Sequence, residues 1–321
     1  MVCPKCGSTV LATDHFCESC GNPIVGAVAS GSASAVQVCH CPPGQSKPDE
    51  AGYCQVCGVR CVSEAVATRK HVEQAIDERL AVVSDIGRRH AINEDAGAVT
   101  RGADGTIVLV VADGVSTAPN SASASTAAVE ATLHTLASVP ADVNIAAALR
   151  SAIDAANQAV ITLPLDAGKT GGPETTIVAA LCRGDSVAVG WSGDSRAYLV
   201  SADGVKSLTV DDSWVEEVVR SGQMSREQAI VDRRAHYVTQ VLGMRDQPLD
   251  VHVVEGKLPA KSILLLCSDG LWNYFQDESD LARALRQCNT GDALSLCRCL
   301  VDAANNHGGH DNVTVAALVV N

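Results

Sequence analysis

The sequence predicts an α+β protein with antiparallel sheets flanked by helices and preceded by a separate cysteine-rich segment. The chain has 321 residues, of which 46% are hydrophobic, so it can bury a large core. Nine of its 14 cysteines lie within residues 1–61. Apolar runs typical of strands come in consecutive pairs, which favours antiparallel sheets over a doubly wound parallel sheet.

The charge distribution excludes several classes of protein. The formal net charge is -13, of which residues 1–62 carry only -1. Non-specific nucleic-acid binding through bulk charge is therefore not expected. No apolar run approaches the roughly 18–20 residues that span a bilayer, and the first residues do not resemble a secretory signal. We expect a cytoplasmic protein with no membrane partner, whose thiols stay reduced.

The first element is a cysteine cluster with metal-ligand spacing. Two C-x2-C pairs are separated by ten residues, and a glycine follows each pair. Four thiolates at this spacing suit tetrahedral Zn²⁺. The segment 1–23 resembles a zinc ribbon, and its expected ligands are Cys3, Cys6, Cys17 and Cys20.

A second cysteine group follows after residues 24–38, which are small and nearly uncharged and predict a flexible linker. His40 or Cys61 could replace one ligand of a second zinc site in residues 39–62. Four thiolates leave no open coordination position, so about two structural zinc ions and a docking or regulatory role are expected. The favoured ligands of the second site are Cys39, Cys41, Cys54 and Cys57.

The remaining chain divides into a short connection and one large domain. Residues 63–80 begin with serine and are rich in helix formers, which predicts a helical linker. The large domain is expected over 81–321. Its strand-like runs are 81–84, 106–112, 175–181, 186–192, 196–201, 251–255, 262–268 and 312–320. Its helix-like segments are 121–138, 144–162, 212–222, 225–231, 278–287 and 292–305.

Acidic motifs stand at the ends of these predicted strands. One Asp-Gly alone is most simply a turn, but five acidic motifs in order indicate a shared site. Carboxylates that converge at one sheet edge repel each other unless a cation lies between them. Oxygen ligands suit Mg²⁺ or Mn²⁺, and two such ions can activate water and hold phosphate oxygens. The motifs are Asn93-Glu94-Asp95, Asp113-Gly114, Gly193-Asp194, Ser268-Asp269-Gly270 and His310-Asp311-Asn312.

This ordered set resembles the type 2C metal-dependent protein phosphatase family, also called PPM, over roughly residues 82–320. The resemblance implies an αββα fold, in which an antiparallel β-sandwich is flanked by helices on both faces. It also implies hydrolysis of phosphoserine and phosphothreonine on proteins with Mn²⁺ or Mg²⁺. The expected partners are therefore phosphorylated Ser/Thr proteins, with a cognate protein kinase or its substrates among them. The stretch 211–245 occupies the place of the family's variable flap.

The resemblance assigns roles to the acidic motifs. Asp113 should bridge two ions, with the carbonyl of Gly114 as a further ligand, and Asp95 should hold metal-bound water. The other expected ligands are Glu94 at one ion, Asp269 and Asp311 at the other, and Asp194 at a third, weaker ion.

Two departures from the family pattern concern catalysis. Where the family commonly has a phosphate-binding arginine, this chain has His90, preceded by Arg88 and Arg89. Phosphate binding is then expected to pass to protonated His90 or to Arg89. A histidine that follows Asp-Gly in some eukaryotic members is Val115 here, so solvent or His90 is expected to protonate the leaving alkoxide. Because no expected metal ligand is missing, an active enzyme is favoured over an inactive phosphoprotein-binding adaptor.

Overall fold

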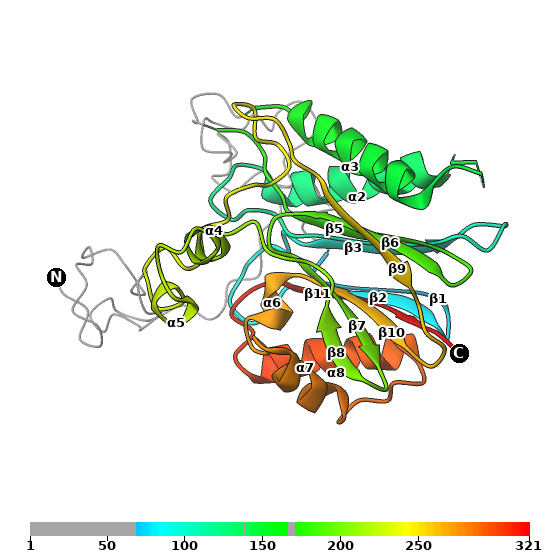
Figure 1. Ribbon diagram of the computed structural model, residues 1–321. Coiled ribbons are helices and arrows are strands. Elements are labelled where there is room, and N and C mark those ends of the chain that lie inside the picture. Colours follow the sequence, from blue (N-terminus) through cyan, green and yellow to red (C-terminus); the bar gives the residue numbers. More distant parts are fainter. Residues whose placement is uncertain (1–68, 138, 141, 166–170) are drawn as a thin grey trace, which may run out of the picture.

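A computed structural model describes residues 69–321, except 138, 141 and 166–170. Two antiparallel sheets stack face to face, and helices cover the outer face of each (Figure 1). The predicted αββα arrangement is therefore confirmed. Both predicted zinc sites lie outside the described residues. Within the described ranges, no helix combines the length and apolarity needed to cross a bilayer.

The larger sheet has six strands in the order β1-β2-β11-β10-β7-β8. The smaller sheet has five strands in the order β3-β4-β5-β6-β9. The bounds in the first sheet are β1 His71–Asp77, β2 Leu80–Asp85, β11 Val313–Val319, β10 Ile263–Cys267, β7 Arg196–Ser201 and β8 Gly204–Ser207. Those in the second are β3 Ala96–Arg101, β4 Ile107–Ala112, β5 Ile177–Arg183, β6 Ser186–Ser192 and β9 His252–Lys257.

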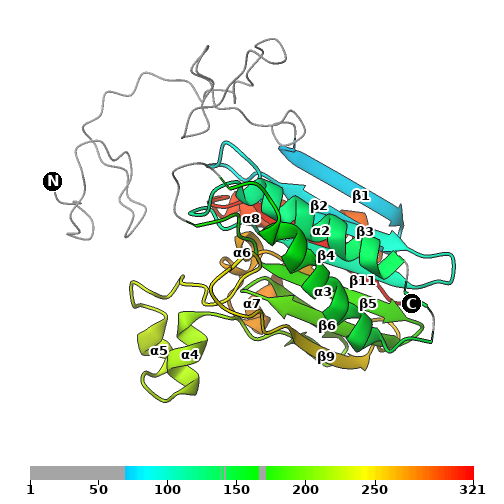
Figure 2. The same ribbon diagram turned by 90° about the horizontal axis from the view of Figure 1, so that it is seen from above.

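The helices divide between the two outer faces and a peripheral segment (Figures 1 and 2). α2 (Ser121–Ala137) and α3 (Ile145–Ile161) cover the five-stranded sheet. α6 (Asp269–Trp272), α7 (Glu278–Leu285) and α8 (Ala293–Asn306) lie on the side of the six-stranded sheet. α4 (Trp214–Arg220) and α5 (Arg226–Ala229) belong to residues 211–245, called the flap below, and project from one side of the sandwich.

Three apolar layers hold the sandwich together, because the central strands of each sheet are buried on both faces. Leu109, Leu264 and Leu266 pack between the sheets. Leu149 and Ile153 of α3 pack on the five-stranded sheet, whereas residues of α8 pack on the other sheet. Strands covered on both faces read as continuous apolar runs, which explains why the sequence revealed the central strands so clearly.

The prediction of a helical linker over 63–80 was wrong for its described part. Residues 71–77 form β1, the edge strand paired with β2, and Leu80 already belongs to β2. Pairing with a neighbouring strand overrode the helix-forming composition. The sequence also missed β3, β8 and the short α6. The expectation of reduced thiols was wrong at one place, because Cys288 and Cys299 form a disulfide.

Candidate active site

Sheet pairing brings the acidic motifs to one end of the sandwich. Asp113 directly follows β4, and Asp95 directly precedes β3, its antiparallel neighbour. Asp269 follows β10 after Ser268, and Asp311 lies two residues before β11, the strand paired with β10. Asp194 lies in the connection from β6 to β7, which joins the two sheets. Both sheets therefore contribute to one group of carboxylates, called the acidic centre below.

The carboxylates of the acidic centre repel one another electrostatically. Burial raises the pKa of Asp113 well above its usual value, and the charges of Asp95, Asp269, Asp311 and Asp194 raise it further. Burial likewise raises the pKa of Asp269 well above normal, with Asp311 the strongest neighbouring charge. Asp113 and Asp269 are thus buried among acidic neighbours, an arrangement that favours a cation between them.

The two other shifted groups titrate closer to neutrality. Burial raises the pKa of Asp95 to about 6, although a hydrogen bond from Ser268 opposes the shift. Burial, followed by repulsion from Asp211, raises the pKa of Asp194 to about 7. Without a counter-ion, the centre therefore holds protons at a pH where ordinary aspartates are ionised.

Unsatisfied oxygens provide a separate observation on cation binding. Asp95 Oδ1 and Asp269 Oδ1 are buried and have no hydrogen-bond partner. A buried carboxylate oxygen without a donor is costly, and a divalent cation is one partner that satisfies it. Among the residues that the structure describes, no three histidine, cysteine or acidic side chains stand close enough together to hold a metal ion as they lie. The donor set nevertheless fits hard cations such as Mn²⁺ and Mg²⁺, because every donor is an oxygen.

Hydroxyl side chains hold the acidic groups in place. Ser268 Oγ donates to Asp95 Oδ2 over 2.7 Å, and Thr314 N donates to Ser268 Oγ over 2.9 Å. Thr175 Oγ1 donates to the Asp113 carbonyl over 2.8 Å. Asp113 N donates to Thr176 Oγ1 over 3.1 Å. Thr175 and Thr176, which directly precede β5, therefore lie at the acidic centre.

Glu94 is positioned by α2 and by the last acidic motif. Ser121 Oγ donates to Glu94 Oε1, and Glu94 N donates to Asn312 Oδ1 over 2.7 Å. The Glu94 carbonyl accepts hydrogen bonds from Ser125 Oγ and from Gly114 N. Its carboxylate thus has a hydroxyl partner, unlike the free oxygens of Asp95 and Asp269.

Two glycines permit the close approach of these segments. A Cβ on Gly270 would lie 1.9 Å from the Asn312 carbonyl oxygen. A Cβ on Gly114 would lie 2.7 Å from the Ser121 carbonyl oxygen. These two motif glycines are therefore required by space, because a side chain at either position would overlap a neighbouring carbonyl oxygen.

His90 and Arg89 occupy different environments. His90 Nε2 lies 3.3 Å from Asp311 Oδ1, and the His90 side chain is 31% exposed. Arg89 is exposed. The structure therefore brings His90 to the acidic centre and leaves Arg89 on the surface beside it.

A groove of about 560 Å³ opens between the acidic centre and the flap. Asp194 and Asp269 line one part, and Ile230 and Val231 of the flap line another. On its floor, Arg196 forms two hydrogen bonds to Asp211, at 2.9 and 2.7 Å, and stacks on Trp272. The groove is therefore lined by charged side chains near the acidic centre and by apolar side chains near the flap.

Sequence reasoning missed several supporting residues. Trp272 Nε1 donates a hydrogen bond to the Asp194 carbonyl over 2.9 Å. Thr176 Oγ1 and Ser195 Oγ share a hydrogen bond of 2.7 Å. Ser268 immediately precedes a motif aspartate, and Asn312 immediately follows another, so their adjacency was the available signal.

Comparisons with known proteins agree with this geometry. Residues 86–293 match the family model described as protein phosphatase 2C, and residues 2–24 match a zinc-ribbon domain. The chain is 32% identical over 237 residues to the serine/threonine phosphatase stp of Listeria innocua, covering 72% of this chain and 92% of that protein.

Solved structures show the same similarity. The Mycobacterium tuberculosis phosphatase PstP/Ppp aligns with a TM-score of 0.64 and 26% identity, covering 76% of this chain and 99% of that one. The PstP catalytic domain in complex with two manganese ions aligns with a TM-score of 0.63 and 30% identity, covering 76% and 98%.

Proposed function

The chain belongs to the protein phosphatase 2C (PPM) family of serine/threonine protein phosphatases and carries an N-terminal zinc-ribbon domain, and we propose that its acidic centre is a dinuclear Mn²⁺ or Mg²⁺ site. The observation that carries this proposal is the convergence of five aspartates from both sheets, two with unsatisfied buried oxygens. Bound metals would acidify water and polarise the phosphoryl group.

The proposed ligands follow from position in the acidic centre. Asp113 has the four other aspartates as its neighbouring charges, which suits a residue shared by two ions. The Gly114 carbonyl and the carboxylate of Glu94, which faces α2, would complete one ion. Asp269 and Asp311 would hold the second ion, and Asp194 a third.

The other groups would orient the reactants. Asp95 is fixed through Oδ2 by Ser268, so its free Oδ1 can accept a hydrogen bond from the attacking water. His90 lies beside Asp311, where its ring N–H can bind a phosphoryl oxygen and protonate the leaving alkoxide. Arg89 would help to bind the phosphate from the exposed edge of the acidic centre. The groove would receive the polypeptide that flanks the phosphorylated residue.

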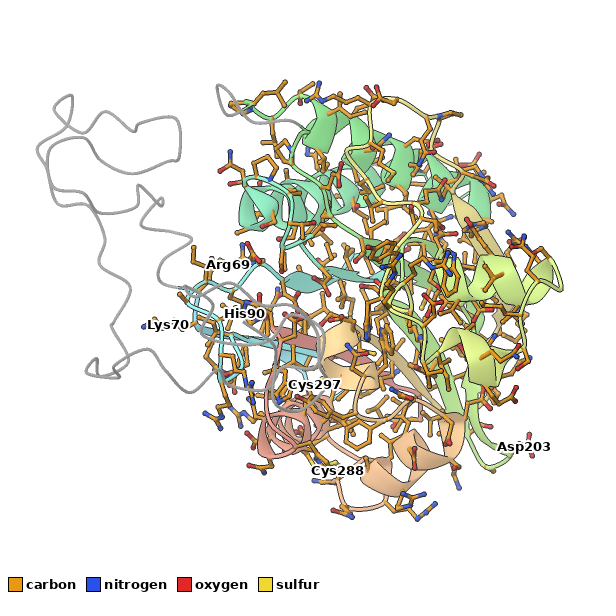
Figure 3. The ribbon with its side chains drawn as sticks, turned by 90° about the vertical axis from the view of Figure 1, so that its left-hand side faces the viewer. Arg69, Lys70, His90, Asp203, Cys288 and Cys297 are labelled. Atoms are coloured by element: carbon orange, nitrogen blue, oxygen red, sulfur yellow. A yellow bond between two sulfur atoms is a disulfide. The ribbon has the colours of Figure 1, made fainter. Side chains whose placement is uncertain are left out.

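The first experiment measures phosphate release from a phosphothreonine peptide by the full chain. Activity should require added Mn²⁺ or Mg²⁺ and disappear with a chelator. Asp113→Asn should lower kcat about 1,000-fold, because one residue serves both ions. The matched control is Asp203→Asn, at an exposed turn on the opposite side of Figure 3 from His90, and it should keep full activity.

Two outcomes would contradict parts of the proposal. Full activity of Asp113→Asn at ordinary metal concentration would exclude the two-metal site. Absence of turnover with any divalent metal, with phosphopeptide binding retained, would favour the phosphoprotein-binding adaptor.

We also propose that the N-terminal region holds two structural zinc ions and selects protein partners. The zinc-ribbon match over residues 2–24 supports the first ion, at Cys3, Cys6, Cys17 and Cys20. Metal analysis should find about two zinc ions in the full chain, and Cys3→Ser with Cys6→Ser should remove one. A fragment 63–321 should hydrolyse a small aryl phosphate within about two-fold of the full chain, because four-thiolate zinc has no open position for water. Loss of that activity in a folded fragment would instead place the zinc modules at the active site.

A further inference from the structure

Arg69 connects the segment before the sandwich to the acidic centre. It lies two residues before β1 and is partly buried. It also lies upstream of residues 86–293, the part that matches the family model. In Figure 3 it is drawn on the same side of the molecule as His90.

The guanidinium of Arg69 bridges two elements. Nη1 donates to Thr126 Oγ1 on α2, and Nη2 donates to the backbone carbonyl of Asp95. Burial lowers the pKa of the Arg69 guanidinium, and the charges of Asp95 and Glu130 oppose that shift. Next in the chain, the Lys70 carbonyl accepts a hydrogen bond from Ile86 N over 2.8 Å, which ties the same segment to the start of the loop that bears His90.

These contacts complete a row of donors along the Glu94–Asp95 backbone. Ser125 of α2 and Gly114 N donate to the Glu94 carbonyl. Arg69 donates to the next carbonyl and is itself linked to α2 through Thr126. The backbone on both sides of the Glu94–Asp95 peptide bond is therefore fixed against α2, and the direction of the Asp95 side chain depends on that backbone.

We propose that Arg69 is a positioning residue for hydrolysis, which holds the Asp95 backbone so that the Asp95 carboxylate points into the acidic centre. The proposal rests on the catalytic role proposed for Asp95. An arginine suits this role because its planar fork can reach two acceptors on different elements, whereas a lysine offers a single point of contact.

Arg69, which contacts Asp95, lies close in sequence to the N-terminal cysteine-rich region. Only residues 63–68 separate it from the end of the predicted second zinc module at residue 62.

The test compares three full-length variants in saturating Mn²⁺ with a small aryl phosphate. Arg69→Ala should lower kcat about ten-fold, as expected when a charge-assisted hydrogen bond no longer fixes a catalytic group, and should leave KM within about two-fold. Arg69→Lys keeps the charge and should recover part of the loss. Lys70→Ala is the matched control, because its exposed side chain is removed while its backbone hydrogen bond remains, and it should behave as the unchanged protein.

A second measurement needs no metal and no turnover. Amide hydrogen exchange at residues 94–97 of the chelated protein should be about ten-fold faster in Arg69→Ala and unchanged in Lys70→Ala. A lower Tm with unaltered kcat of the folded protein and unaltered exchange at 94–97 would make Arg69 a stabilising residue only, and would overturn the proposal. If the unchanged chain itself showed no metal-dependent turnover, the proposed function would fail first, and the exchange measurement would still decide the role of Arg69.

Discussion

The acidic centre and the flap lie side by side along one groove, yet they are built differently. The centre lies at the ends of strands that are packed in three large apolar layers. Its carboxylates are held by buried hydroxyl groups such as that of Ser268. The flap has a small apolar cluster around Val215, Val218 and Ala229, supplemented by Arg234 stacked on Trp214. It leaves Val231 81% exposed.

This difference indicates a division of tasks. Hydrolysis needs groups fixed to within a fraction of an ångström, which rigid elements provide. Recognition of varied protein substrates tolerates, and profits from, a segment with few buried contacts. We therefore expect substitutions at the centre to alter folding or kcat, and substitutions on the flap to alter the choice of substrate.

The largest expected effect is on stability, and it compares two glycines, Gly270 beside the acidic centre and Gly222 in the flap. Gly270→Ala should cost at least ~3 kcal/mol of unfolding free energy, because its Cβ would overlap the Asn312 carbonyl. Gly222→Ala in the flap should cost only ~1 kcal/mol of unfolding free energy. Its φ of +71° is unfavourable for alanine, but the space around its Cβ position is open, so no overlap adds to that cost. Urea unfolding of chelated protein measures both. Equal costs would mean that the two regions are equally constrained.

The next effect concerns protons at the acidic centre. The folded-state pKa values of Asp95 and Asp194 are raised from 3.8 to about 6 and about 7. Groups with raised pKa values stabilise the fold below their unfolded pKa, and this stability is lost as pH rises through the folded values. Metal-free protein should therefore become steadily less stable from about pH 5 to about pH 8.

Metal should reverse the direction of this dependence, because binding displaces protons from the same oxygens. Thermal unfolding with a chelator and with saturating Mn²⁺, each across this pH range, measures both slopes. A chelated protein that became more stable towards pH 8 would contradict the raised pKa values.

The smallest expected effect is confined to protein substrates. Val231→Asp should raise KM for a phosphoprotein about five-fold, since a groove-lining valine that is covered on binding contributes about 1 kcal/mol. KM for a small aryl phosphate should not change. Val210→Asp is the matched control, because Val210 is 61% exposed but does not line the groove. Equal responses of the two variants would remove the flap from substrate selection.

The parts of the fold that sequence could predict are those whose causes are local. The strands β4, β5, β10 and β11 are buried on both faces, so each is a continuous apolar run in the sequence and was predicted from it. β1 was mistaken for helix because most of its residues are exposed, and its composition carried no two-sided burial signal. Only its pairing with β2 makes it a strand.

The acidic centre shows the same limit. Its aspartates were predicted because their motifs carry the resemblance, and the comparisons confirm the family. The contact from Arg69 to Asp95 and the bond from Ser268 to Asp95 join residues that are 26 and 173 positions apart. Such contacts depend on the register of whole sheets, which spacing within one motif does not contain. The Cys288–Cys299 disulfide was missed for a related reason, since it needs the chain after α7 to fold back along α8.

The place of β11 has a consequence for how the protein is made. This strand is the last in chain order, yet it lies between β2 and β10 in the larger sheet and begins two residues after Asp311. During synthesis, β2 leaves the ribosome more than two hundred residues before the strand that must pair with it. The nascent polypeptide cannot assemble the acidic centre until that strand has emerged, so a ribosome-bound intermediate should have no hydrolytic activity towards phosphorylated proteins around it.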